Sequence, residues 1–191
     1  MNKLQNKKVF RFDDICINSN MEEANHMASI ILEKHPDATV LYCISPCVNN
    51  MESPDRITSQ RIFPKIYNAY SDYRIFYRLE KIGLPTVPEY VTKASHGLVH
   101  VDHRLLEYAA QEMSILVSCS LSQSKIFVPP FNKWNKDTEK ICTENGVELV
   151  KFEDGWLCAE YNDYDEEHQL WYLHHREFTP ESFNKWINIS I

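Results

Sequence analysis

The residues of this sequence that are best suited to chemistry are two adjacent carboxylates and a group of histidines. Asp13 and Asp14 end an apolar segment at residues 8–15 that has the pattern of a buried strand. Five of the eight histidines fall in two short stretches: His96, His100, His103, His174 and His175. An Asp-Asp pair alone commonly closes a turn. Buried carboxylates, however, need a cation, water or hydrogen-bond donors, and the histidines make a cation site a real alternative.

His96 and His100 are four residues apart. Together with a carboxylate from another strand end, such a pair makes a three-ligand site for zinc or a similar divalent ion, with one position open to water. The ion lowers the pKa of that water and polarises a carbonyl oxygen. A second carboxylate can then take the water's proton, and a histidine on the opposite side can protonate the leaving group. These residue types favour metal-assisted hydrolysis of an amide or ester.

The apolar segments that must position these residues alternate between strand and helix patterns. Such alternation predicts an α/β domain with a mainly parallel sheet, either open or closed into a barrel. In this architecture functional residues gather at the C-terminal ends of the strands, where the aspartates and the histidine stretches fall. Strands are expected at residues 8–15, 38–44, within 91–101, and at 125–128, 147–152 and 171–174.

Several helix boundaries follow from capping residues. Asn20 is expected to cap the first helix, residues 137–145 form a helix that ends at Gly146, and Thr179 caps the last helix with Pro180 at its first position. The inner face of the first helix is expected to hold Ala24, Met27, Ala28 and Ile31. The inner face of the helix after the first histidine stretch is expected to hold Leu105, Leu106, Ala109, Met113 and Leu116.

The composition places limits on the function. A length of 191 residues predicts one domain, residues 1–191. The net charge of −7 argues against nucleic acid and anionic membrane as main partners. No apolar run reaches the length of a membrane span. The N-terminal residues lack a secretory pattern, which predicts a cytoplasmic protein whose six cysteines are free thiols.

Four motifs, taken in chain order, resemble the polysaccharide deacetylase (NodB-homology) superfamily. They are Arg11-Phe12-Asp13-Asp14, His96-x-x-x-His100, Phe127-Val128-Pro129-Pro130 and Leu173-His174. They span nearly the whole chain in the family's order. The resemblance implies a distorted, incomplete (β/α) barrel of about seven mainly parallel strands. It also implies metal-dependent removal of acetyl groups from N- or O-acetylated sugars.

The resemblance assigns a role to each motif residue. It implies that Asp13 is the catalytic base, that Asp14, His96 and His100 bind the metal, and that His174 is the catalytic acid. Zinc is the first choice of metal, with cobalt, nickel and manganese as alternatives. His174 fits the motif better than His175, because neighbouring strand residues point to opposite faces.

Substrate contacts are expected from the proline motif and the residues after it. Pro130 matches the part of the family that shapes the groove wall, and Asn132 and Trp134 are candidates for hydrogen bonding and stacking on a sugar. Trp134 equally fits packing beneath the loop. His103 is either an alternative metal ligand or a hydrogen-bond partner of one.

The sequence departs from the family pattern at several positions. Ile15 replaces a glycine, Gly97 replaces a serine or threonine, and Phe127 stands where an arginine would orient the base. Arg11 and Lys133 are candidates to replace that arginine. The family's aspartate–tryptophan motif has no convincing match, although the Asp-Gly-Trp at residues 154–156 lies in the right region.

The function expected from these observations is that of a metal-dependent deacetylase-like hydrolase acting on an acetylated sugar or sugar precursor. One alternative is a non-catalytic carbohydrate-binding relative, which the missing arginine favours. Another is a metal hydrolase of a different C–N bond, with Asn132 in a distinguishing pocket. The aromatic-rich part of residues 46–88 suits either a sugar-binding surface or packing.

Overall fold

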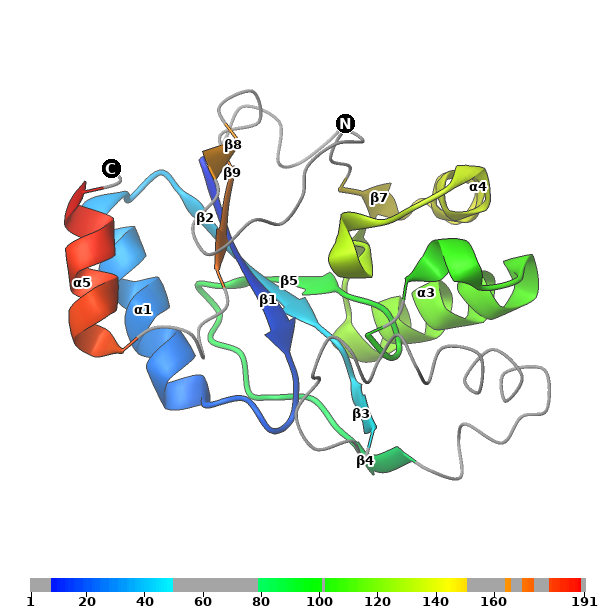
Figure 1. The fold of residues 1–191 in the computed structure, drawn as a ribbon, viewed down its shortest axis with the longest axis horizontal. Helices are drawn as coiled ribbons and strands as arrows, with labels where there is room; N and C mark the ends of the chain where they lie inside the picture. The colour runs from blue at the N-terminus through cyan, green and yellow to red at the C-terminus, as the bar shows by residue number, and fades with distance from the viewer. Residues whose placement is uncertain are drawn as a thin grey trace.

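The computed structural model describes residues 8–49, 79–100, 102–150, 164–165, 170–173 and 179–189. These residues form a sheet of the order β7-β6-β5-β2-β1-β9-β8 (Figure 1). Its strands are β1 (Val9–Ile15), β2 (Thr39–Ile44), β5 (Thr92–Ser95), β6 (Ile126–Phe127), β7 (Glu148–Leu149), β8 (Tyr164–Asp165) and β9 (Leu170–Leu173). All neighbours are parallel except β8 and β9. The expected α/β class with a parallel sheet is confirmed.

A separate antiparallel pair is formed by β3 (Cys47–Asn49) and β4 (Leu79–Ile82). The whole aromatic-rich stretch between these two strands, residues 50–78, lies outside the described residues. Among the described residues, no helix has the length and apolar character needed to cross a bilayer. The strand expected within residues 91–101 is β5, and the chain after it is the expected exit loop. Among the described residues, the strands expected at 125–128 and 147–152 are confined to Ile126–Phe127 and Glu148–Leu149.

The helices all pack on one face of the sheet. The even-numbered residues Phe10 and Phe12 of β1 pack with α1 (Met21–Lys34) and α5 (Pro180–Ile189) in one core cluster. Farther along the sheet, Phe127 packs with α3 (Tyr108–Ser122) and α4 (Lys136–Glu144) in another. In Figure 1, α1 and α5 lie together at the left of the strands, and α3 and α4 lie together at the right.

The opposite face of the sheet carries its own apolar cluster of Val9, Leu41, Cys43, Ala94, Ile126 and Val128. Helices on one face only are typical of a barrel wall, whereas a doubly wound sheet has helices on both faces. The arrangement is consistent with the expected incomplete barrel, whose closure stays a prediction.

The first helix forms as its sequence pattern predicts. The side chain of Asn20 accepts a hydrogen bond from the backbone N–H of Glu23 at 3.3 Å, and His35 caps the other end before Pro36. The buried residues of α1 are Ala24, Met27, Ala28 and Ile31, as expected. The caps of the two later helices are confirmed as well, at Gly146 after α4 and at Thr179 before α5.

The expected inner face of α3 is only partly confirmed, because Leu116 packs against a core cluster but other members of the predicted set do not. Ala109 is exposed and Leu105, just before the helix, is 48% exposed, while only Leu106 of the predicted set is buried. The residues of α3 that are buried are Gln111, Ser114, Ile115, Ser118, Cys119 and Ser122. A hydropathy pattern assigns serine to the surface. It therefore predicts the wrong side of this helix as the buried one.

The serines of α3 can be buried because their hydroxyls are already hydrogen-bonded. Ser118 donates to the carbonyl of Ser114 at 2.5 Å, and Ser122 donates to that of Ser118 at 2.7 Å. The Ser118 hydroxyl also lies 2.5 Å from that of Ser95 in β5. These small side chains bring α3 close to β5, the strand that leads into the histidine stretch.

This close approach can be tested at Ser118, which is fully buried. We expect Ser118→Leu to lower the free energy of unfolding by about 2 kcal/mol, because the larger side chain must push α3 away from β5. The matched control is Val117→Leu on the exposed side of α3, where the change should stay within about 0.5 kcal/mol. Urea denaturation measures both, and equal effects would contradict the packing described here.

Candidate metal centre

The first component of the site is Asp14, near the C-terminal end of β1. The pairing of β1 with β2 shifts in register between Phe12 and Ile15, and Asp14 has a left-handed backbone with φ of 59°. A bulge of this kind redirects a side chain at the end of a strand. It lets the adjacent Asp13 and Asp14 meet different partners.

The second component is His96, directly after β5. Its backbone N–H donates to the carbonyl of Ile44 at 2.8 Å, which continues the pairing of β5 with β2. Its ring is 1% exposed, and Nδ1 lies 2.8 Å from the carbonyl oxygen of Val128. A carbonyl only accepts hydrogen bonds, so Nδ1 carries the proton and Nε2 offers its lone pair. This Nε2 lies 3.6 Å from Oδ1 of Asp14.

The third component is His100, whose Nε2 lies 3.0 Å from the same oxygen of Asp14. Its side chain is 29% exposed, so this edge of the site opens to solvent. The His100 ring packs between two other rings, with its centroid 5.0 Å from that of His96 and 4.3 Å from that of Phe131. The backbone N–H of Leu98 donates to the hydroxyl of Ser114, which ties the loop to α3.

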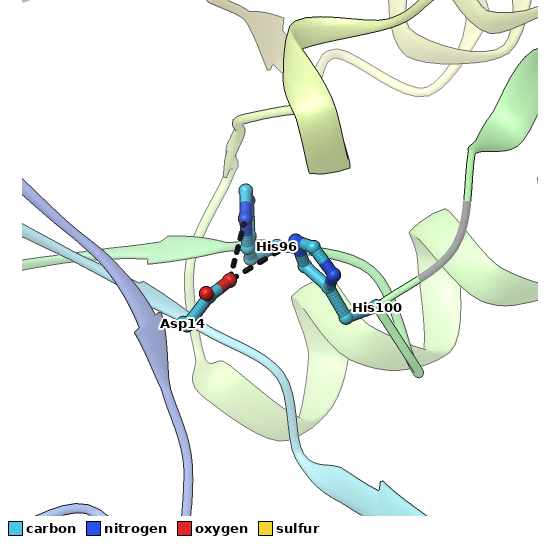
Figure 2. Close-up of side chains that lie close together, drawn as sticks. All are labelled: Asp14, His96 and His100. Atoms are coloured by element: carbon cyan, nitrogen blue, oxygen red, sulfur yellow. Dashed lines mark ion pairs between the residues drawn. The ribbon is translucent and has the colours of Figure 1, made fainter. Parts of the chain in front are cut away.

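Figure 2 shows the three side chains converging from two strand ends. One ligand atom from each of Asp14, His96 and His100 lies within 4.8 Å of the others. One carboxylate and two imidazoles, one of them oriented by a carbonyl, form a donor set that suits zinc and similar ions. Among the described residues this is the group of side chains that can hold a metal ion.

The electrostatics of Asp14 fit this role. Burial raises the pKa of its carboxyl, but the neighbouring His100 and His96 outweigh burial and hold the pKa well below its usual value. The carboxylate is therefore ionised at neutral pH, as metal binding requires.

Asp13 has a different environment from Asp14. It is 7% exposed, and its Oδ2 accepts a hydrogen bond from the fully buried guanidinium of Arg11 at 2.5 Å. The same nitrogen of Arg11 donates to Oδ1 of Asn132 at 2.9 Å. The neighbouring thiol of Cys43 stays protonated, because burial and Asp13 both raise its pKa.

His103 supports the loop rather than joining the three ligand candidates. It is fully buried, its Nε2 lies 3.0 Å from the hydroxyl of Ser114, and its ring meets that of Phe127 edge-on. This geometry favours the supporting role over the alternative of a metal ligand.

The predicted substrate-binding residues lie in or just after a short turn, Pro130–Asn132. Pro130 is buried and the Asn132 side chain binds Arg11. Trp134 is partly buried and packs against the apolar cluster that includes Val9 and Leu41, which favours the packing alternative. Phe131 is an additional residue of the site that was not among the predicted positions, and it is 37% exposed beside His100. An aromatic residue directly after two prolines was the available signal.

His174, its competitor His175 and the Asp-Gly-Trp segment at 154–156 lie outside the described residues. The role of His174 as catalytic acid stays a prediction.

No protein-family model and no curated protein matches this chain. Among solved structures, it is similar to a wild-type CE4 family pseudoenzyme from Bacillus anthracis, with a TM-score of 0.44 and 12% identity over 77% of this chain and 44% of that chain. Two mutants of that pseudoenzyme, one described as having restored enzymatic activity, give TM-scores of 0.43 and 0.42 at 12% identity, over 76% of this chain and 44% of theirs. The chain spans less than half the length of these structures.

The geometry of the histidine loop predicts a strong effect of Gly97→Ala. Gly97 has φ of +83°, and a Cβ there would lie 2.9 Å from Cε1 of His103 and 3.0 Å from the carbonyl oxygen of Val99. Because Ser114 holds His103 and the other contact is backbone, the loop must shift. We expect at least about a tenfold loss of zinc affinity, measured by titration, as small displacements of supporting groups commonly cost 10–100-fold.

Gly146→Ala is the matched control. Gly146 has φ of +63° with nothing within 4 Å of an added Cβ. It should lose only about 1 kcal/mol of stability from the left-handed backbone and keep its zinc affinity. Equal zinc affinities in the two variants would show that the loop tolerates displacement.

Proposed function

We propose that this chain is a metal-dependent hydrolase of the polysaccharide deacetylase type, which removes an acetyl group from an N- or O-acetylated sugar or sugar precursor. The observation that carries the proposal is the convergence of Asp14, His96 and His100, with a second buried carboxylate, Asp13, next to Asp14 in the chain. The ordered motifs of the sequence support the choice of reaction.

Each residue has a defined task in this reaction. Asp14, His96 and His100 would hold the ion, and Asp13 accepts the proton of the attacking water. A divalent ion bound there, zinc first and otherwise cobalt, nickel or manganese, supplies polarisation of the acetyl carbonyl and activation of water. His174 donates a proton to the leaving amine or alcohol.

The proposed substrate is a small acetylated sugar or a glycan, with no role for nucleic acid. The sugar can approach from the solvent side of His100, where the exposed ring of Phe131 packs against this histidine. An apolar ring at this edge can stack against a sugar face. The net charge of −7 suits a sugar better than a polyanion.

A second candidate function is a carbohydrate-binding relative that keeps the site without turnover. The observation that favours it is Phe127, which is fully buried where the motif would place a base-orienting arginine. Hydrolysis of a different C–N bond is a further alternative. Its distinguishing pocket was expected to involve Asn132, whose amide oxygen is used by Arg11.

The metal content of the purified protein tests the site directly. We expect about one divalent ion per chain, lost in the double variant His96→Ala with His100→Ala and retained in the control His26→Ala, an exposed histidine on α1. Elemental analysis measures it. A wild-type protein that contains no metal, and binds no zinc, cobalt or nickel when these are added, would contradict the hydrolase mechanism.

The variant Asp13→Asn distinguishes an active deacetylase from a protein that only binds carbohydrate. An enzyme should retain its metal and lose at least about a hundredfold in the rate of acetate release from acetylated sugars, because general base catalysis is worth that much. A binder should show no acetate release in the wild type and keep its sugar affinity in the variant. Both quantities are measured with the same panel of acetylated sugars.

A further inference from the structure

The guanidinium of Arg11 lies at the centre of a buried polar contact that connects three parts of the site. Arg11 is fully buried in the middle of β1 and is among the largest side chains with no exposure. Burying a charge requires good partners. Asp13 is one of them, two residues later in the chain and on the same face of the strand, at 2.5 Å.

The second partner of Arg11 is Asn132, in the turn at the end of β6. Phe131 and Asn132 both have left-handed backbones, with φ of 56° and 54°. A left-handed backbone is unfavourable for phenylalanine and persists only where its surroundings hold it. The Arg11–Asn132 hydrogen bond is one such restraint, and Phe131 in turn packs on the ring of His100. One side chain therefore links Asp13 to the wall of the metal site.

We propose that Arg11 is a positioning residue that divides two adjacent aspartates between two tasks. It engages Asp13 as an ion pair and keeps this carboxylate out of the coordination of the metal, so that Asp14 alone of the two binds the ion. This inference rests on the proposed function, in which Asp13 is the base, and it gives Arg11, one of the two candidates to replace the missing arginine, the specific task of holding Asp13 away from the metal.

Arg11→Met tests the proposal through the metal affinity as well as turnover. Without the guanidinium, the buried carboxylate of Asp13 loses its ion pair. A divalent ion bound at Asp14 then provides the positive charge that stabilises this carboxylate. An opposite charge at short range shifts the pKa of a carboxyl group by about one to three units, and each unit corresponds to a factor of about ten in an equilibrium constant. We therefore expect the dissociation constant for Co²⁺ to fall by about tenfold, while acetate release falls by at least about tenfold.

A merely structural role for Arg11 predicts a different result. A loosened site would lower metal affinity and turnover together, whereas the proposal requires them to move in opposite directions. The double variant Arg11→Met with Asp13→Asn is the control, because without the Asp13 charge the gain in Co²⁺ affinity should vanish. Weaker Co²⁺ binding by folded Arg11→Met, or a gain that persists in the double variant, would overturn the proposal.

The absorption spectrum of the Co²⁺-loaded protein keeps the proposal testable if Arg11→Met fails to fold. If Arg11 keeps Asp13 out of the coordination, the visible bands of Asp13→Asn should match those of the wild type in position and intensity. Shifted bands would show that Asp13 is a ligand and would overturn the proposal.

The two hypotheses fail separately. Wild-type protein that binds Co²⁺ without acetate release from any sugar would remove the proposed function, while tighter Co²⁺ binding by Arg11→Met would still establish the division of the aspartates. Conversely, an active wild type combined with weaker binding by Arg11→Met would remove only the role of Arg11.

Discussion

The organisation of this molecule depends on the need to compensate two adjacent carboxylates at the end of a buried strand. Asp13 meets the guanidinium of Arg11, and Asp14 meets the imidazoles of His96 and His100. The ion pair of Asp13 forms within β1, whereas the pairing of Asp14 requires the loop after β5. The turn after β6 supplies Asn132 as a second partner of Arg11. The parallel sheet brings these elements together because the strands end at the same edge.

Backbone strain is concentrated where these elements meet. Asp14, Gly97, Phe131 and Asn132 all have positive φ and lie at the site, whereas the other described residues with positive φ end helices. Such conformations cost energy and persist only when the surrounding structure fixes them. At Gly97 the fixation comes from the buried hydroxyl of Ser114, which binds both the backbone of the histidine loop and the ring of His103, and at Asn132 it comes from the hydrogen bond with Arg11. The polar inner face of α3 thus belongs to the support of the site.

Sequence patterns predicted the local features and the grouping of Asp14 with His96 and His100, but they missed the buried face of α3 and the link from Arg11 to Asn132. Nearest-neighbour rules predict the strand that leads to Asp13 and the helix cap at Asn20. They also single out His96 and His100, because these histidines are four residues apart. The structure contains all of these features. The inner face of α3 could not be predicted, because hydropathy does not register that a serine can satisfy its hydroxyl within its own helix. The link from Arg11 to Asn132 spans 121 residues and leaves no local pattern.

The contact between Arg11 and Asp13 also explains how the chain can depart from the motif at Phe127. Residues two apart on a strand share a face at a distance fixed by the backbone, so Arg11 reaches Asp13 without depending on the geometry of the loop after β6. Position 127 is then free to be apolar. Phe127 uses it to fill the core between α3 and α4 and to pack against His103. The buried phenylalanine and the buried arginine are therefore two parts of one arrangement, in which the charge comes from β1 and the support of the histidine loop from β6.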